Sequence, residues 1–115
     1  MPPGLADNGV MPDLDSEAVL AAVARDQQLR VFMDGGRIGT MPARQSRRRQ
    51  LLDVIAQAFE PGVRYPEQRV SEFLGAIHPD HAALRRYLVD EQFLSRSGGE
   101  YWRSGGTVPV PEDPR

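Results

Sequence analysis

The chain has 115 residues, the length of one domain, and it contains no cysteine, which excludes disulfides, thiolate metal sites and cysteine nucleophiles. No apolar run approaches the roughly 20 residues that a helix needs to cross a bilayer. The N-terminal residues also lack the basic and apolar regions of a secretory signal. We therefore expect a cytoplasmic protein that does not enter a membrane.

The net charge is −2, and it is unevenly distributed along the chain. Residues 1–41 hold three arginines and six acidic residues, whereas residues 42–104 hold ten arginines and eight acidic residues, a net charge of +2. This excess of positive charge is compatible with binding to a polyanion such as DNA. All fourteen basic residues are arginine, and genome composition accounts for that more readily than function does.

The first part of the chain predicts an arm followed by a helix. Residues 1–13 contain three prolines and two glycines, which is typical of a flexible arm. A helix is predicted over residues 15–27, where Val19, Leu20 and Val23 form an apolar stripe. Three residues can cap its start: Asp13, Asp15 and Ser16.

A β-hairpin is predicted over residues 29–40. Apolar and polar residues alternate there, and Gly35-Gly36 permits the positive φ angles of a tight turn. A phosphate-binding loop would need a longer glycine motif and a following helix, and the sequence has neither. Residues 14–41 are thus expected to form an accessory helix and hairpin.

A long helix is predicted from Pro42 to about Phe59, before the break at Pro61-Gly62. Its first turns contain four arginines, although the helix dipole disfavours cations at that end. Three explanations stay open: acidic neighbours compensate these charges, a phosphate backbone compensates them, or they form a solvated basic face. These arginines are Arg44, Arg47, Arg48 and Arg49.

Two short helices and a second hairpin follow. Helices are predicted over residues 66–77 and 80–91, joined by a short turn, which is the helix-turn-helix plan. In the second helix, Asp80 is the expected cap, and the apolar residues share one face. A hairpin over residues 93–104 turns at Gly98-Gly99, which places Arg96 opposite Tyr101 and Leu94 opposite Arg103.

These elements predict a small α+β fold. Residues 42–104 are expected to form a winged-helix-like domain, with a three-helix core and the C-terminal β-hairpin as its wing. The N-terminal helix and β-hairpin of residues 14–41 are expected to pack against it, and residues 105–115 are expected to form a disordered tail.

Three blocks of sequence also carry a family resemblance. They are FEPGVRYPE at residues 59–67, LRRYLVD at residues 84–90, and the pair LSR and YWR at residues 94–96 and 101–103. With these blocks in this order, residues 38–104 resemble the bacterial family called domain of unknown function 2087. The resemblance implies a helix-turn-helix protein that occurs alone or attached to transcriptional regulators, and it supplies no catalytic residues. Pro66 stands where relatives commonly place a serine or threonine cap.

The candidate contacts with DNA are arginines. Arg85 and Arg86 lie on the outer face of the second short helix, where they can reach guanine edges or phosphates in a major groove. The alternative is that one of them pairs with a carboxylate inside the fold. The remaining candidates are expected to contact the backbone from the hairpin and the long helix: Arg96, Arg103, Arg47 and Arg48.

Other chemistry finds little support in the sequence. Tyr101 and Trp102 could stack on single-stranded bases, but one ring in the core and one at the surface is the commoner arrangement. His78 and His81 are separated by a proline that breaks their convergence on one metal ion, so no metal or cofactor is expected. No set of nucleophile, base and orienting residue can be assembled, so we expect a protein that is not an enzyme.

Two functions remain in competition. The first is a DNA-binding or transcription-regulatory module whose partner is double-stranded DNA. The second is a non-catalytic interaction module on the same scaffold, which would bind a regulator protein or form a homodimer. The arginine pattern favours the first, and the acidic N-terminal third favours the second.

Overall fold

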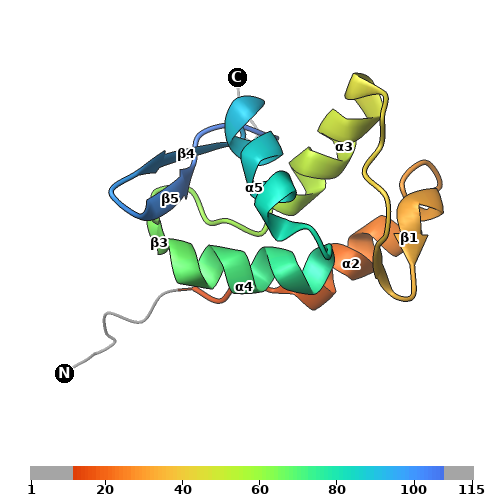
Figure 1. Cartoon of the computed structure of the whole chain (residues 1–115), viewed down its shortest axis with the longest axis horizontal. Coiled ribbons are helices and arrows are strands. Elements are labelled where there is room, and N and C mark those ends of the chain that lie inside the picture. The colour runs from red at the N-terminus through yellow and green to blue at the C-terminus, as the bar shows by residue number, and fades with distance from the viewer. Residues whose placement is uncertain (1–11, 108–115) are drawn as a thin grey trace, which may run out of the picture.

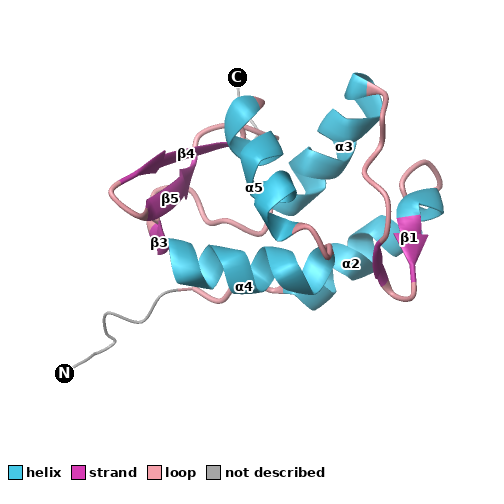
Figure 2. Ribbon diagram, viewed as in Figure 1, coloured by secondary structure: helices cyan, strands magenta, loops and turns pink. Residues whose placement is uncertain are grey.

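The computed structural model describes residues 12–107, which form a small α+β fold with four α-helices and two small antiparallel sheets (Figures 1 and 2). The helices are α2 (Ser16–Arg25), α3 (Gln45–Ala56), α4 (Glu67–Ile77) and α5 (His81–Asp90). The predicted flexible arm and disordered tail lie mostly outside the described residues.

The two sheets lie at opposite ends of the molecule (Figure 2). One sheet pairs β1 (Met33–Asp34) with β2 (Arg37–Ile38), after the short 3-10 helix η1 (Arg30–Phe32). The other contains β3 (Tyr65–Pro66), β4 (Leu94–Ser97) and β5 (Glu100–Arg103), in the spatial order β3-β5-β4. The predicted hairpin register is confirmed, because Arg96 pairs with Tyr101 and Leu94 pairs with Arg103.

Side-chain caps start two of the helices as predicted. Asp15 accepts a hydrogen bond from the backbone N–H of Ala18 at 3.0 Å, and Asp80 accepts one from that of Ala83 at 3.1 Å. Each bond satisfies an N–H group that has no partner within its own helix. Helix α3 has no such cap and begins at Gln45, three residues later than predicted, because Arg44 keeps an extended backbone.

The first hairpin is shorter than predicted because the chain turns before it. The carboxylate of Asp26 accepts hydrogen bonds from the backbone N–H groups of Gln28 and Leu29. These bonds wind residues 26–32 into turns and η1, where the sequence alternation had indicated a strand. One result is that Val31 points to solvent and is 72% exposed.

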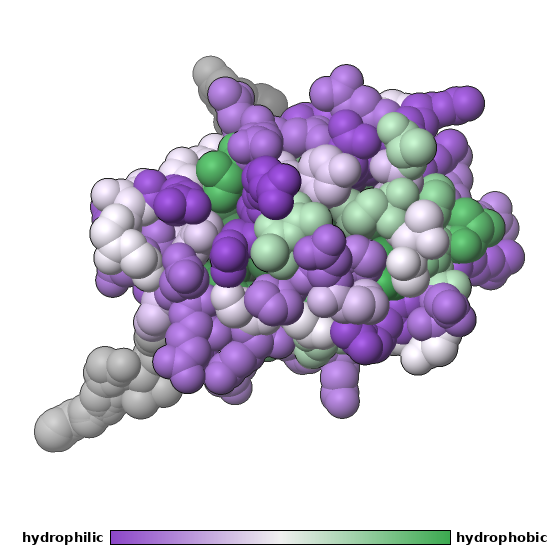
Figure 3. Space-filling model, in the orientation of Figure 1, coloured by the Kyte–Doolittle hydropathy of each residue, from purple (hydrophilic) through white to green (hydrophobic). Residues whose placement is uncertain are grey.

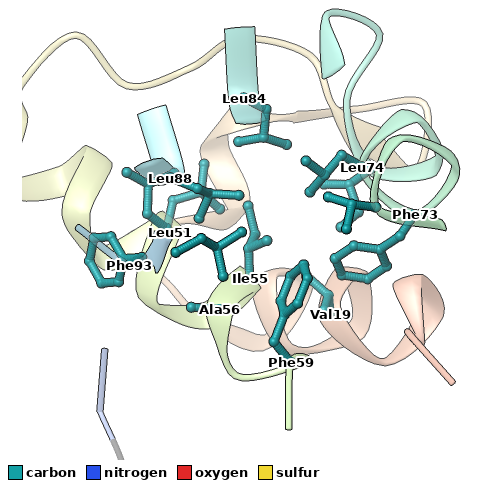
Figure 4. Packing of buried hydrophobic residues seen from close by; sticks show 14 of the residues in the cluster. Val19, Leu51, Ile55, Ala56, Phe59, Phe73, Leu74, Leu84, Leu88 and Phe93 are labelled. Carbon is teal, nitrogen blue, oxygen red and sulfur yellow. The ribbon is translucent and has the colours of Figure 1, made fainter. Parts of the chain in front are cut away.

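A single hydrophobic core joins all four helices (Figure 4). Val19 of α2 packs in the same cluster as Leu51 and Ile55 of α3, so the accessory helix shares the core of the other three. Phe59 of this core forms perpendicular ring pairs with Tyr65 and Phe73, at centroid distances of 5.2 and 5.5 Å. Perpendicular aromatic pairs of this kind add about 0.5–1.5 kcal/mol each beyond area burial.

The strand β3 ties the second hairpin to the helices and was not predicted from the sequence. Tyr65 pairs with Tyr101, and both side chains are buried. Trp102 faces the other side of the sheet, where the guanidinium of Arg64 lies 4.0 Å from its ring centroid. One aromatic residue therefore enters the core and the other stays near the surface, as the sequence favoured.

Helix α5 ends in a left-handed turn at Gln92, which has a φ angle of 69°. Its backbone N–H donates to Val89 and that of Phe93 donates to Leu88, the two bonds of a Schellman motif. Glycine usually occupies this position because any other residue is strained at positive φ.

Replacing Gln92 with glycine should therefore stabilise the fold. We expect Gln92→Gly to raise the free energy of unfolding by roughly 0.5–1 kcal/mol. Relief of the backbone strain stabilises the folded state, and the greater conformational entropy of glycine in the unfolded chain offsets part of that gain. Urea unfolding would measure the change. Gln92→Ala keeps the strained φ and should give no gain, and equal stabilities of the two variants would contradict the explanation.

At the end of the described chain, Asp53 of α3 holds Thr107. Its carboxylate accepts hydrogen bonds from the backbone N–H and the hydroxyl of Thr107, both at 2.7 Å. Burial raises the pKa of Asp53. The hydrogen bonds from Thr107, a further hydrogen bond from Gln57 and the positive charge of Arg103 lower it by more, so the pKa lies below its usual value.

The lowered pKa predicts a pH-dependent contribution from Asp53. Ionised Asp53 stabilises the fold above its unfolded pKa of about 3.9, and the contribution is lost as pH falls through the lower folded value. We expect Asp53→Asn to be less stable than wild type at pH 7, with the difference shrinking below about pH 4. Urea unfolding at several pH values would test this, with the exposed Asp34→Asn as a control. A difference that persists unchanged at pH 2 would contradict it.

Candidate nucleic-acid interface

Helix α5 and the hairpin of β4 and β5 enclose a pocket of about 190 Å³. Strongly hydrophilic side chains gather where the helix faces the hairpin (Figure 3). The pocket is lined by three of the candidate arginines, Arg85, Arg86 and Arg96, together with Val89, Asp90 and Tyr101. Residues from two consecutive elements, α5 and β4, thus bring three positive charges together.

Arg85 is held in place by neighbours on two sides. Its guanidinium donates a hydrogen bond to the hydroxyl of Ser71 on α4 at 2.7 Å. The same group lies 6.0 Å from the ring centroid of Tyr101, at the limit of a cation–π contact. Neither neighbour is a carboxylate, so these contacts fix the orientation of Arg85 without neutralising its charge.

Arg86 and Arg96 are exposed. Within residues 12–107, neither side chain forms an ion pair or a hydrogen bond. The backbone of Arg96 is nevertheless fixed, because it pairs with that of buried Tyr101. The alternative was that an internal carboxylate pairs with Arg85 or Arg86. Neither arginine forms an ion pair in the described part of the chain.

A second hollow of about 490 Å³ continues from the pocket and shares Val89 and Arg96 with it. It runs toward the base of the hairpin, where Gln92, Ser95 and Ser104 line it. Together the two hollows form a groove along one side of α5, which we call the α5–hairpin groove. It presents arginines at one end and uncharged polar side chains at the other.

The other candidate arginines make contacts within the fold. Arg48 donates to Glu91 at 2.7 Å with its side chain 16% exposed, and Arg49 reaches the same carboxylate at 3.4 Å. Arg103 donates to the backbone carbonyls of Gly105 and Phe59. These contacts explain how the basic start of α3 is tolerated, since Glu91 supplies the acidic neighbour that the sequence required.

Arg47 remains on the surface of α3, where its only side-chain hydrogen bond within residues 12–107 is to Gln50, at 2.7 Å. The structure therefore groups Arg85, Arg86 and Arg96 and leaves Arg47, Arg48 and Arg103 outside that group.

The two histidines, His78 and His81, lie close to each other at the turn between α4 and α5. The Nδ1 atom of His78 is 2.7 Å from the backbone carbonyl of Ile38 and links α4 to β2. Nδ1 of His81 is buried without a hydrogen-bond partner in the described region. Over residues 12–107 there is no group of three histidine or acidic side chains that could hold a metal ion.

Comparison with protein families gives one match. The profile of the family described as "Uncharacterized protein conserved in bacteria (DUF2087)" matches residues 37–103, more than half of the chain. The protein belongs to the DUF2087 family. The match confirms the resemblance that the three sequence blocks indicated. No curated protein and no solved structure matches the chain.

The DUF2087 match contains every lining residue of the α5–hairpin groove except Ser104, and it excludes α2. Gln92, Ser95 and Ser104 of the groove were not singled out from the sequence. The Gly98-Gly99 hairpin signal gave the register of the strands, but only the left-handed turn after α5 brings Gln92 toward them. Among the helices of residues 12–107, none is long and apolar enough to cross a membrane.

The contact of Arg48 with Glu91 should stabilise this DUF2087 protein measurably. Both side chains are largely buried, so a double-mutant cycle of Arg48→Gln and Glu91→Gln should give a coupling energy of roughly 1–3 kcal/mol. Urea unfolding of the four proteins would supply it. Arg64 and Glu100, 3.6 Å apart and about half exposed, provide the matched control, with an expected coupling of about 0.5 kcal/mol or less. Equal couplings would contradict the role given to Glu91.

Proposed function

We propose that the protein is a DNA-binding module of winged-helix type that acts in transcription regulation in the bacterial cytoplasm, without catalytic activity. The observation that carries the proposal is the convergence of Arg85, Arg86 and Arg96 in the groove between α5 and the hairpin. Positive charge on a helix and on a neighbouring hairpin is a typical footprint for the phosphates of a duplex.

The arrangement of elements supports the winged-helix interpretation. Helices α4 and α5 are joined by a turn of three residues, as in a helix-turn-helix unit. The hairpin of β4 and β5 follows α5 directly, and β3, located between α3 and α4, adds the third strand. In this interpretation α5 is the recognition helix and the hairpin is the wing.

The contacts of the arginines suggest different roles in DNA binding. Arg86 and Arg96 have exposed side chains, so they would bind phosphates or base edges directly. Arg47 would add a backbone contact from α3. Arg48 and Arg103 would act indirectly, because their contacts with Glu91 and with backbone carbonyls hold the surrounding elements in place.

A second candidate is the protein-interaction module, and one observation favours it. Val31 is a large apolar side chain that is 72% exposed, and apolar side chains gather on the side of the molecule that carries η1 and β1 (Figure 3). Such a surface can bind a regulator protein or a second copy of the chain.

Binding to random-sequence duplex DNA across a salt series tests the first proposal. We expect the affinity to fall steeply with salt, because bound phosphates release counterions. The variant with Arg85→Ala and Arg86→Ala should bind more weakly at every salt concentration. Its plot of log affinity against log salt should be shallower, by about 0.9 for each phosphate contact that is lost. Fluorescence anisotropy would supply the affinities, and circular dichroism would show that the variant is folded.

The matched control removes two exposed arginines from the accessory segment, Arg25→Ala with Arg30→Ala. It has the same net charge as the test variant and should keep the wild-type salt slope. No binding at low salt, or equal losses in the two variants, would overturn the DNA-binding proposal. Sedimentation of the protein alone would then test the interaction module.

A further inference from the structure

We infer that the pocket of the α5–hairpin groove binds one phosphate group, held jointly by Arg85, Arg86 and Arg96. A phosphate of this kind has two possible sources, the backbone of a nucleic acid and a free phosphate or phosphate ester. For the first source the inference rests on the proposed function, and for the second it stands alone.

The charges that line the pocket match a phosphate. Three guanidinium groups and the single carboxylate of Asp90 give a local charge of +2, in a protein whose net charge is −2. A phosphate monoester carries about −1.5 to −2 at pH 7, and a backbone phosphodiester carries a single negative charge. Either anion would be attracted at short range, because the opposing charges of the chain are screened beyond about 8 Å at physiological salt.

The donors that face the pocket are arranged for an anion before it arrives. Arg85 uses one of its N–H groups to reach Ser71, and the four others stay available. Since Arg85 is already oriented, it loses little side-chain freedom when an anion binds. Arg86 and Arg96 make no ion pair within residues 12–107, so no internal carboxylate has to be displaced from them. The planar guanidinium fork matches the oxygens of a phosphate.

The size of the pocket is sufficient for a phosphate group. Its volume of about 190 Å³ is below the roughly 300–1,000 Å³ of typical ligand sites. It can hold a phosphate with a few waters, since one water occupies about 30 Å³ of the liquid. Whatever the phosphate is attached to would extend into the adjoining hollow of about 490 Å³, past Arg96 toward Gln92.

Titration of the full chain with inorganic phosphate at constant ionic strength tests the inference. Nuclear magnetic resonance of the guanidinium N–H groups would follow each arginine. We expect saturable shifts of the signals of Arg85, Arg86 and Arg96, while those of Arg48 and Arg30 stay in place. Unsaturable shifts spread over all exposed arginines would overturn the inference.

Two variants with opposite expected effects strengthen this test. Arg96→Ala removes one charged donor and should weaken phosphate binding roughly tenfold. Asp90→Asn removes the only carboxylate that lines the pocket and should tighten binding about three- to tenfold, a gain that misfolding cannot imitate. Arg30→Ala should leave the affinity unchanged. An unchanged affinity in Asp90→Asn would contradict the site.

The same signals distinguish the source of the phosphate. If a short duplex shifts the three arginines and inorganic phosphate competes with it, the site binds the nucleic-acid backbone. If phosphate binds there and the duplex does not bind at all, the site stands and the DNA-binding proposal fails. If neither the duplex nor inorganic phosphate shifts these three signals, the site is wrong, and a duplex that still binds must use another surface of the protein.

Discussion

The pairing of β3 with β5 is the contact on which the candidate site depends. It is only two residues long, yet it places Tyr65 and Tyr101 side by side, both buried. Tyr65 in turn packs against Phe59, and its hydroxyl accepts a hydrogen bond from the backbone of Glu60. Through these contacts the hairpin joins the helical core, and its position beside α5 is fixed. By itself, a hairpin with two strands of four residues would be only marginally stable.

Two groups of arginines are treated in opposite ways by the fold. At the start of α3, Arg48 and Arg49 meet Glu91, and their guanidinium groups lie over the rings of Tyr87 and Phe93. In the α5–hairpin groove, by contrast, Arg85 contacts the hydroxyl of Ser71 and the ring of Tyr101. Arg86 and Arg96 have no side-chain partner within residues 12–107. The ion pairs of Glu91 therefore distinguish a structural basic cluster from a second cluster that forms no ion pair within residues 12–107.

Much of this fold follows from local signals in the sequence. The caps at Asp15 and Asp80 and the Gly98-Gly99 turn placed their elements well, because each acts over a few residues. The strand β3 could not be predicted, since two residues carry no periodicity and pair only with a strand more than thirty residues away. The three groove arginines were all candidates, but their separation from Arg48 depended on the long-range contact with Glu91.

The register of the hairpin also affects how Arg96 moves. Its backbone is paired with that of Tyr101, which is buried to 1% exposure, while the tip at Gly98 and Gly99 is open to solvent. Arg96 thus lies on the paired part of the hairpin, close to its turn. At Arg96, capturing an anion would restrict the rotamers of the side chain, because the backbone is already paired with that of Tyr101. The entropic cost at this residue is then about 0.5–1.5 kcal/mol, the amount typical of one immobilised long side chain.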